Sequence, residues 1–172
     1  MTADGSSSFK AESGRYHLHI AINCPWAHRT RIFRTLKRLK NVISMSIVLP
    51  RRTDQGWVFD NDDPVYRDHC LGTQALHEVY RLAQPDYSGS VTVQTLWDTE
   101  PRTIVNNESS EIIRMLNSEF QACTDDKTDY YREPLRKEID ALNAVIYPTA
   151  NNGVYRADFA STQDAYEKAD RK

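Results

Sequence analysis

GRYHLHIAINCPWAHRTRIFRTLKRLKNVISMSIVLP, residues 14–50, predicts a strand, a helix and a second strand in direct succession. Residues 14–22 alternate and are rich in β-forming side chains, which is typical of a strand. The next segment, 25–40, begins with Pro25, which suits a first helical turn. Its apolar side chains recur at roughly helical spacing: Trp26, Ile32, Phe33, Leu36 and Leu39. Residues 42–50 form the second strand, and because a crossover helix separates the two strands, we expect them to be parallel.

The following part of the chain continues the alternation of strands and helices. Residues 71–84 predict a short helix, 91–98 and 102–106 a β-hairpin, and 108–120 a further helix. The order βαβ-αββα is that of a thioredoxin-like α/β domain, with a mixed sheet and helices on both faces. The polar segment 50–67 is long for a loop, and loops of that length are usually functional or disordered.

We place the thioredoxin-like domain at residues 1–120, a polar linker at 121–130 and a helical region at 131–172. The main helix of this last region carries one apolar face: Leu135, Ile139, Leu142 and Ile146. A final helical segment begins near Ser161.

The composition excludes several classes of protein. The 172 residues are 40% hydrophobic and carry a formal net charge of −2, which does not favour binding to nucleic acid. We expect no contact with membranes, because no apolar stretch approaches the roughly 20 residues that span a bilayer. The N-terminal stretch lacks the apolar region of a signal peptide. The three cysteines are widely spaced, which suits a reducing compartment, so we expect a cytoplasmic protein.

Cys24 stands where the first strand passes into the helix. A helix N-terminus offers unpaired N–H groups and a partial positive charge, which favour the thiolate form of a cysteine. The alternative is an ordinary buried cysteine, which is common in protein cores. A dithiol oxidoreductase would carry a second cysteine at position 27, where this chain has Ala27. Redox chemistry at Cys24 would therefore need a small thiol as its partner, and glutathione is the obvious candidate.

Several motifs carry a family resemblance: GRYHLHIAINCPWAHRT (14–30), GWVF (56–59), LWD (96–98), TIVNNESSEIIRMLN (103–117) and NNGVYRADFASTQDAYEKA (151–169). In order and spacing they resemble the glutathionyl-hydroquinone reductases, also called xi-class glutathione transferases, over nearly the whole chain. The resemblance implies a thioredoxin-like glutathione-binding domain followed by the start of an all-helical C-terminal domain. It also implies an enzyme that removes glutathione from glutathionyl-hydroquinones, with glutathione as co-substrate.

The resemblance assigns roles to three residues near helix starts. Cys24 matches the catalytic cysteine, which attacks the sulfur of a glutathionyl-hydroquinone, releases the hydroquinone and becomes disulfide-bonded to glutathione. A second glutathione then frees the enzyme. Glu108 and Ser109 match the element that holds the γ-glutamyl ammonium and carboxylate groups. The plainer interpretation is a helix N-cap with acidic residues in the first turn, and both interpretations can hold together.

Three further residues match binding positions of the family. Trp57 corresponds to a tryptophan that closes over glutathione, although a solitary loop tryptophan is more often a packing anchor. Tyr155 matches a tyrosine that faces the aromatic substrate and donates a hydrogen bond to its departing oxygen. Its alternative role is packing between domains. Val93 precedes the position where this fold pairs its backbone with the cysteinyl part of glutathione.

The sequence departs from the family pattern at two positions near Val93. Gln94 stands where the family has a cis-proline, and a cis bond costs about 2.5–4 kcal/mol before other residues against about 0.5–1 kcal/mol before proline. Either the bond remains cis at this cost, or it is trans and the glutathione-pairing edge is reshaped. Ser90 stands where family members often have an arginine, so we expect weaker binding of glutathione.

A third departure is the length, because family members extend beyond both ends of this sequence. We therefore expect the dimer contacts that the resemblance implies, those of a homodimer, to lie largely outside this chain. We also expect exposed apolar surface on the thioredoxin-like domain and on the helix near 135–147. The alternative function is a catalytically impaired module that binds glutathione or another protein.

Two other patterns point to no separate site. The histidines lack the spacing of a shared metal site, so we expect no metal: His17, His19, His28, His69 and His77. The basic segment 29–40 could suggest contact with a membrane or with nucleic acid, and we interpret it instead as a solvated helix face.

Overall fold

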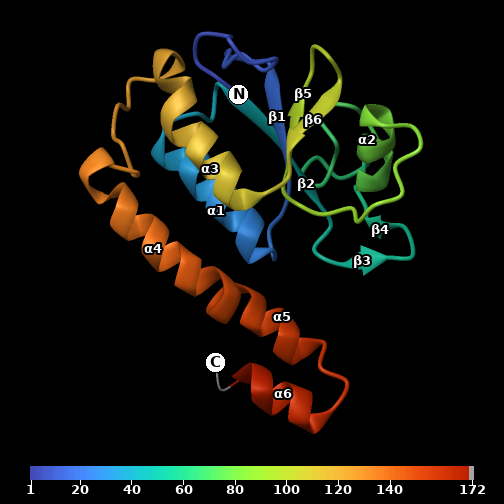
Figure 1. The fold of residues 1–172 in the computed structure, drawn as a ribbon. Helices are drawn as coiled ribbons and strands as arrows, with labels where there is room; N and C mark the ends of the chain where they lie inside the picture. Colours follow the sequence, from blue (N-terminus) through green and yellow to red (C-terminus); the bar gives the residue numbers. More distant parts are fainter. Residues whose placement is uncertain (171–172) are drawn as a thin grey trace. The chain divides into compact units, whose positions relative to one another are not determined.

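The computed structural model describes residues 1–170, and the chain divides into two compact units, Met1–Asp129 and the residues from Tyr130 onward. The first unit contains a sheet with helices on both faces, and the second unit contains only helices (Figure 1). This confirms the predicted thioredoxin-like α/β fold followed by helical segments. The division into a domain at 1–120, a linker at 121–130 and a helical region at 131–172 stays a prediction.

The elements of the first unit are β1 (Tyr16–Ala21), α1 (Pro25–Leu36), β2 (Ile43–Val48), β3 (Arg52–Thr53), β4 (Gly56–Trp57), α2 (Leu76–Ala83), β5 (Thr95–Asp98), β6 (Thr103–Asn106) and α3 (Ser109–Ser118). A 3₁₀ turn, Glu119–Cys123, continues α3. The second unit contains a 3₁₀ turn (Glu133–Leu135), α4 (Arg136–Ile146), a π-helical turn (Tyr147–Asn151), α5 (Asn152–Asp158) and α6 (Gln163–Asp170).

The main sheet has the strand order β2-β1-β5-β6. Strand β1 pairs in parallel with β2, from Tyr16 opposite Ile43 to Ala21 opposite Val48, so the predicted parallel pairing is confirmed. The other pairs, β1 with β5 and β5 with β6, are antiparallel. Within the segment expected to be a loop, β3 and β4 form a short antiparallel hairpin.

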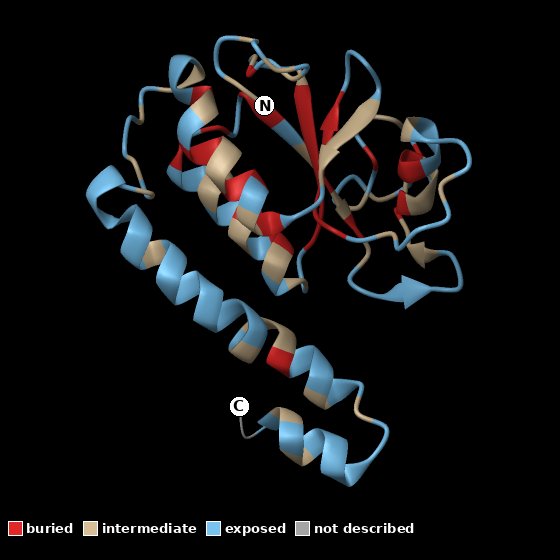
Figure 2. Ribbon diagram, viewed as in Figure 1, coloured by how far each residue is buried: buried red, intermediate tan, exposed pale blue. Residues whose placement is uncertain are grey.

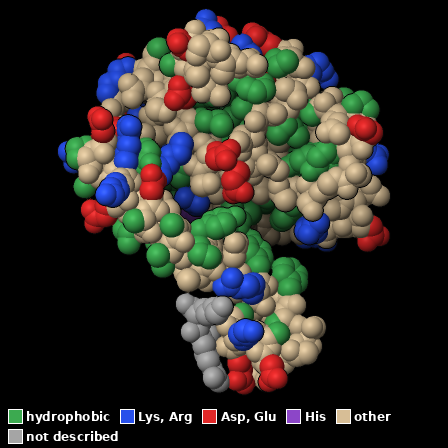
Figure 3. All heavy atoms as spheres, viewed as in Figure 1, with side chains coloured by type: hydrophobic (Ala, Val, Ile, Leu, Met, Phe, Trp, Pro, Cys, Tyr) green, Lys and Arg blue, Asp and Glu red, His purple; other side chains and the backbone are tan. Residues whose placement is uncertain are grey.

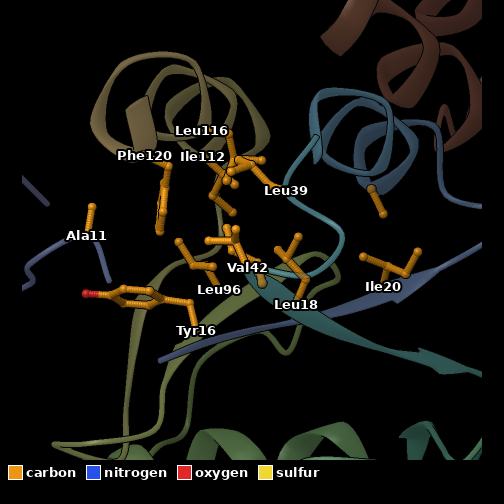
Figure 4. Packing of buried hydrophobic residues seen from close by; sticks show 12 residues of the cluster. Ala11, Tyr16, Leu18, Ile20, Leu39, Val42, Leu96, Ile112, Leu116 and Phe120 are labelled. Carbon is orange, nitrogen blue, oxygen red and sulfur yellow. The ribbon is translucent and has the colours of Figure 1, made fainter. Parts of the chain in front are cut away.

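Two hydrophobic clusters cover the two faces of this sheet, because successive residues of β1 point to opposite faces. Tyr16, Leu18 and Ile20 belong to the first cluster, together with side chains from α1 and α3. The ring of Phe120 packs edge-on against Tyr16, with the ring centroids 5.7 Å apart (Figure 4). The second cluster, with Trp97 of β5, packs against α2. All six residues of β1 are consequently buried (Figure 2).

The prediction that the basic segment is a solvated face is wrong for three of its cations. Lys37 is fully buried, and its Nζ donates to the carbonyl oxygen of Thr128 at 2.5 Å. Arg34 donates from Nε to the carbonyl oxygen of Ile43 at 2.6 Å. Arg29 is also half-buried. The physical reason is that long basic side chains can bury their apolar stems when the charged head reaches oxygen acceptors.

The exposed apolar surface predicted from the sequence is present in each unit. On α1, Ile32 and Leu36 are exposed, although their spacing had placed them on the buried stripe. On α4, Leu142 and Val145 are exposed. Acidic and basic side chains are interspersed on the face in Figure 3. Among residues 1–170, no helix is long and apolar enough to cross a membrane.

Candidate active site

Cys24 is the N-cap residue of α1, directly after the end of β1. Its extended backbone conformation lets the chain turn from strand into helix, and its carbonyl oxygen accepts the first helical hydrogen bond from the N–H of His28 at 3.0 Å. The side chain is half-buried and packs against both hydrophobic clusters. Its Sγ lies 4.0 Å from the carbonyl oxygen of Val93, to which the thiol donates. The fold therefore brings together two predicted site residues from distant parts of the chain.

Val93 and Gln94 join the loop after α2 to β5. Of the two alternatives that the sequence leaves open here, the structure has the cis peptide bond between Val93 and Gln94. The Gln94 side chain is buried, and its Nε2 donates to the carbonyl oxygen of Asn107 at 2.9 Å. Its Oε1 is buried and has no hydrogen-bond partner among residues 1–170. The Gln94 side chain thus ties this loop to the segment before α3.

Glu108 and Ser109 form the beginning of α3, where Glu108 is the N-cap residue and is exposed. Ser109 is buried, and its hydroxyl accepts a hydrogen bond from the guanidinium of Arg29 on α1 at 3.2 Å. Burial lowers the pKa of Arg29, and the negative charge of Glu108 opposes that shift. A cation and the N–H groups of a helix start therefore adjoin one another, which suits a carboxylate ligand.

Arg29 is a candidate binding residue that the sequence reasoning missed. It was included in the basic segment interpreted as solvated. A signal was available, because Arg29 lies five positions after Cys24 on the same predicted helix. That signal could not show that the N-terminus of α3 packs beside α1, since Ser109 is 80 residues away in sequence.

Trp57 and Tyr155 occupy different units. Trp57 lies on β4, packs against the second hydrophobic cluster as Cys24 does, and stacks with Arg52, whose Cζ is 5.7 Å from its ring centroid. Tyr155 lies on α5, where its ring stacks with that of Phe159 at 6.4 Å and lines an open groove between α5 and α6. The binding role of Trp57 and the catalytic role of Tyr155 stay predictions.

The other two cysteines are less suited to act as nucleophiles. Burial raises the pKa of the Cys70 thiol to about 11, and the negative charge of Asp68 adds to the shift. Cys70 is therefore protonated near neutral pH, and the thiol is a much weaker nucleophile than the thiolate. Cys123 lies at the C-terminal end of the 3₁₀ turn Glu119–Cys123, where the unpaired backbone groups are carbonyls, which do not stabilise a thiolate as the N–H groups near Cys24 do. These environments leave Cys24 as the best-placed thiol.

A buried polar group lies on the α2 side of the sheet, where the sequence had indicated no clustering. His17, His19 and Asp68 each offer a possible metal-ligating atom within 4.8 Å of the others. Both ring nitrogens of His17 already have partners, Ser44 Oγ at 2.6 Å and Ser46 Oγ at 2.8 Å. His19 Nε2 faces Asp68 Oδ1 at 3.3 Å. Because most of these atoms already have partners, we interpret the group as a structural network.

This network makes the stability of the first unit sensitive to acid. Burial, with a smaller contribution from His19, lowers the pKa of His17 to about 3, against roughly 6.5 when unfolded. The unfolded chain therefore binds the additional proton between these values. We expect the free energy of unfolding to be fully retained above pH 6.5 and to fall as the pH drops toward 3, by up to about 1.4 kcal/mol per pH unit.

Urea unfolding at several pH values between 4 and 7 measures this slope. The variant His17→Gln should flatten it, whereas His28→Gln, at an exposed position on α1, should leave it unchanged. An equal slope in wild type and His17→Gln would contradict the assignment to His17.

Comparison with known proteins identifies the family. The domain described as "Glutathione S-transferase, N-terminal domain" matches residues 23–119. Glutathionyl-hydroquinone reductase YqjG of Escherichia coli (strain K12) is 48% identical over an alignment of 176 residues, which covers 98% of this chain and 54% of the relative. Glutathionyl-hydroquinone reductase PcpF of Sphingobium chlorophenolicum is 49% identical over 163 residues, which are 95% of this chain and 52% of the relative.

A solved structure agrees with these matches in fold. The Xi glutathione transferase ECM4 from Saccharomyces cerevisiae, in complex with glutathione, has a TM-score of 0.91 at 36% identity, covering 98% of this chain and 59% of that chain. The chain spans about half the length of the curated relatives that it matches. The resemblance drawn from the sequence motifs is confirmed, since the relatives matched along nearly the whole chain are glutathionyl-hydroquinone reductases and a xi-class transferase, and this chain belongs to the glutathione S-transferase family.

Proposed function

We propose that this chain is a glutathione-dependent reductase that removes glutathione from glutathionyl-hydroquinones through a mixed disulfide on Cys24. The observation that carries the proposal is the position of Cys24, half-buried at the start of α1 and 4.0 Å from the Val93 carbonyl oxygen. The chain has no second cysteine at position 27 to resolve a disulfide internally. Thiolate chemistry at Cys24 therefore depends on an external thiol. The names and bound ligand of the relatives support glutathione in that role.

The reaction takes two steps, and each is the attack of a thiolate on sulfur. The Cys24 thiolate attacks the glutathione sulfur, so that an S–S bond forms while the bond from sulfur to the aromatic carbon breaks. That carbon takes up a proton, and the hydroquinone leaves. The thiolate of a second glutathione then attacks the mixed disulfide, which releases glutathione disulfide and restores the Cys24 thiolate. The two glutathiones are oxidised, and the aromatic carbon is reduced.

The predicted binding residues contact different parts of glutathione. The backbone at Val93 pairs with the cysteinyl part, as an added strand would. Glu108 holds the γ-glutamyl ammonium, while Ser109 and the N–H groups at the start of α3 hold its carboxylate. Trp57 covers the bound tripeptide. Tyr155 donates a hydrogen bond to the oxygen of the departing hydroquinone. The widely spaced thiols suit the reducing cytoplasm as the location.

The test is to mix the purified chain with a glutathionylated hydroquinone, record its intact mass, and follow hydroquinone release with excess glutathione. We expect a glutathione adduct on Cys24 and release over many turnovers. An adduct without continued release would favour the alternative, an impaired module that binds glutathione. A folded sample with neither adduct nor release would refute the proposal.

Arg29 provides a more specific prediction about glutathione binding. Replacing Arg29 by glutamine should weaken binding roughly tenfold, because a charge-assisted hydrogen bond contributes about 1.5–3 kcal/mol, part of which the amide retains. The change should disappear for cysteinylglycine, which lacks the γ-glutamyl carboxylate. Isothermal titration calorimetry with both ligands measures the difference.

The matched control is Arg31→Gln, which removes an exposed cation two positions along the same helix. It should bind glutathione almost as the wild type does. An equal loss of affinity in both variants would show a general effect of charge and would contradict a specific role for Arg29.

A further inference from the structure

The hydroxyl of Tyr80 on α2 forms hydrogen bonds with two other segments of the chain, at Thr92 and at Asn107. Tyr80 lies on α2, is buried, and donates to the carbonyl oxygen of Thr92 at 2.9 Å. The Tyr80 hydroxyl oxygen in turn accepts from Nδ2 of Asn107 at 3.2 Å and from the N–H of Thr92 at 3.4 Å. A phenolic hydroxyl donates once and accepts twice, so its hydrogen-bonding capacity is used in full.

These contacts connect the two edges of the proposed glutathione site, which are the backbone at Val93 and the start of α3. Thr92 immediately precedes Val93, and Asn107 immediately precedes Glu108 and Ser109. Asn107 also donates to the Thr92 hydroxyl at 3.1 Å, and Gln94 closes a second link to the Asn107 carbonyl oxygen. Helix α2 covers the face of the sheet opposite to α1 and α3 (Figure 1). The hydrogen bonds of Tyr80 therefore tie a helix on that face to this junction.

We propose that Tyr80 is a positioning residue for glutathione, which it does not itself touch. The inference rests on the proposed function, because it concerns the glutathione site described above. A tripeptide that binds both the Val93 edge and the start of α3 requires those two edges at a fixed separation, and movement of either one costs affinity. The Tyr80 hydroxyl, together with Asn107, holds the two edges at this separation.

The test compares Tyr80→Phe with Tyr87→Phe. Tyr80→Phe removes one oxygen atom and keeps the ring that packs in the second cluster. Tyr87 supplies a matched control, since its ring lies 5.0 Å from that of Tyr80 but its hydroxyl donates to the Ser90 carbonyl oxygen, away from the junction. Two quantities are measured well below the unfolding temperature: the dissociation constant of glutathione, and amide hydrogen exchange in peptides covering 92–95 and 107–109.

We expect Tyr80→Phe to weaken glutathione binding about tenfold, the equivalent of one lost hydrogen bond, and to accelerate exchange in both peptides. Tyr87→Phe should match the wild type in both measurements. Asn107→Ala should reproduce the loss, and the double variant should lose little more than either single variant, because both act through one contact. A lower unfolding temperature with unchanged binding and unchanged exchange would mean that Tyr80 only packs, and would overturn the proposal.

Glutathione binding by the wild type distinguishes failure of the proposed function from failure of this inference. If the folded wild type does not bind glutathione, the function above is refuted, and hydrogen exchange alone decides the role of Tyr80. Faster exchange at both edges in Tyr80→Phe would then show that the hydroxyl holds the two edges together, without a role in binding glutathione. Unchanged exchange, or a change at one edge only, would refute it.

Discussion

Replacing Cys24 by serine should lower the rate of hydroquinone release at least about a thousandfold, because a hydroxyl near neutral pH cannot supply the nucleophile that a thiolate provides. Glutathione should still bind. Serine leaves the backbone at Val93 and the start of α3 unchanged, and the thiol makes only a long contact of 4.0 Å with the Val93 carbonyl oxygen. The loss should therefore appear in the turnover number rather than in the dissociation constant of glutathione.

The control for this experiment is Cys70→Ser. Burial raises the pKa of Cys70 to about 11, so its thiol is protonated at neutral pH and its removal should leave turnover nearly unchanged. Intact-mass measurements should show the glutathione adduct in wild type and in Cys70→Ser, and no adduct in Cys24→Ser. Turnover above about a tenth of the wild-type rate in Cys24→Ser would place the reacting thiol elsewhere.

Replacing Asp68 by asparagine should destabilise the first unit by about 3 kcal/mol, because one carboxylate organises the loop before α2. Its Oδ1 accepts from the N–H groups of Cys70 at 3.1 Å and Leu71 at 3.3 Å. Its Oδ2 accepts from the N–H and the hydroxyl of Thr73, at 3.1 and 2.7 Å. Asparagine would present an NH₂ group to donors on one side, and those donors would lose their acceptor in a buried environment.

The charges in this group support the same expectation. Burial alone would raise the pKa of Asp68, but hydrogen bonds from His19 and Thr73 outweigh it and lower the pKa below its usual range. Asp68 is therefore ionised, and it contributes stability that is present above the unfolded pKa and is lost as the pH falls through the lowered value. Asparagine at this position should remove that contribution.

Chemical denaturation at pH 7 measures the free energy of unfolding for this variant. Asp62→Asn is the matched control, since Asp62 lies in the same loop and is exposed. It should change stability by less than about 0.5 kcal/mol. A loss below about 1 kcal/mol in Asp68→Asn would show that the loop does not depend on the carboxylate.

The first βαβ unit was predictable because its signals are local. Alternation in β1, apolar spacing after Pro25 and the apolar run of β2 each occupy a continuous segment, and a crossover helix requires parallel pairing. The position of Cys24 at the junction followed from the same pattern. Local spacing was less reliable for the buried face of α1, where Ile32 and Leu36 are exposed while Ala27 and Thr30 are buried. Spacing identifies a helix, whereas the buried face depends on what packs against it.

By itself, the sequence determined the order of the four strands of the main sheet and of their helices, the family through its motifs, and Cys24 as the candidate nucleophile. Only the tertiary structure decided which distant side chains meet: Arg29 with Ser109, His19 with Asp68, and Tyr80 with Asn107. The physical reason is that helical and strand periodicities report on neighbours a few residues apart, while a hydrogen bond across the fold depends on how elements pack. The proposed nucleophile was therefore visible in the sequence, whereas the proposed roles of Arg29 and Tyr80 became visible only in the folded chain.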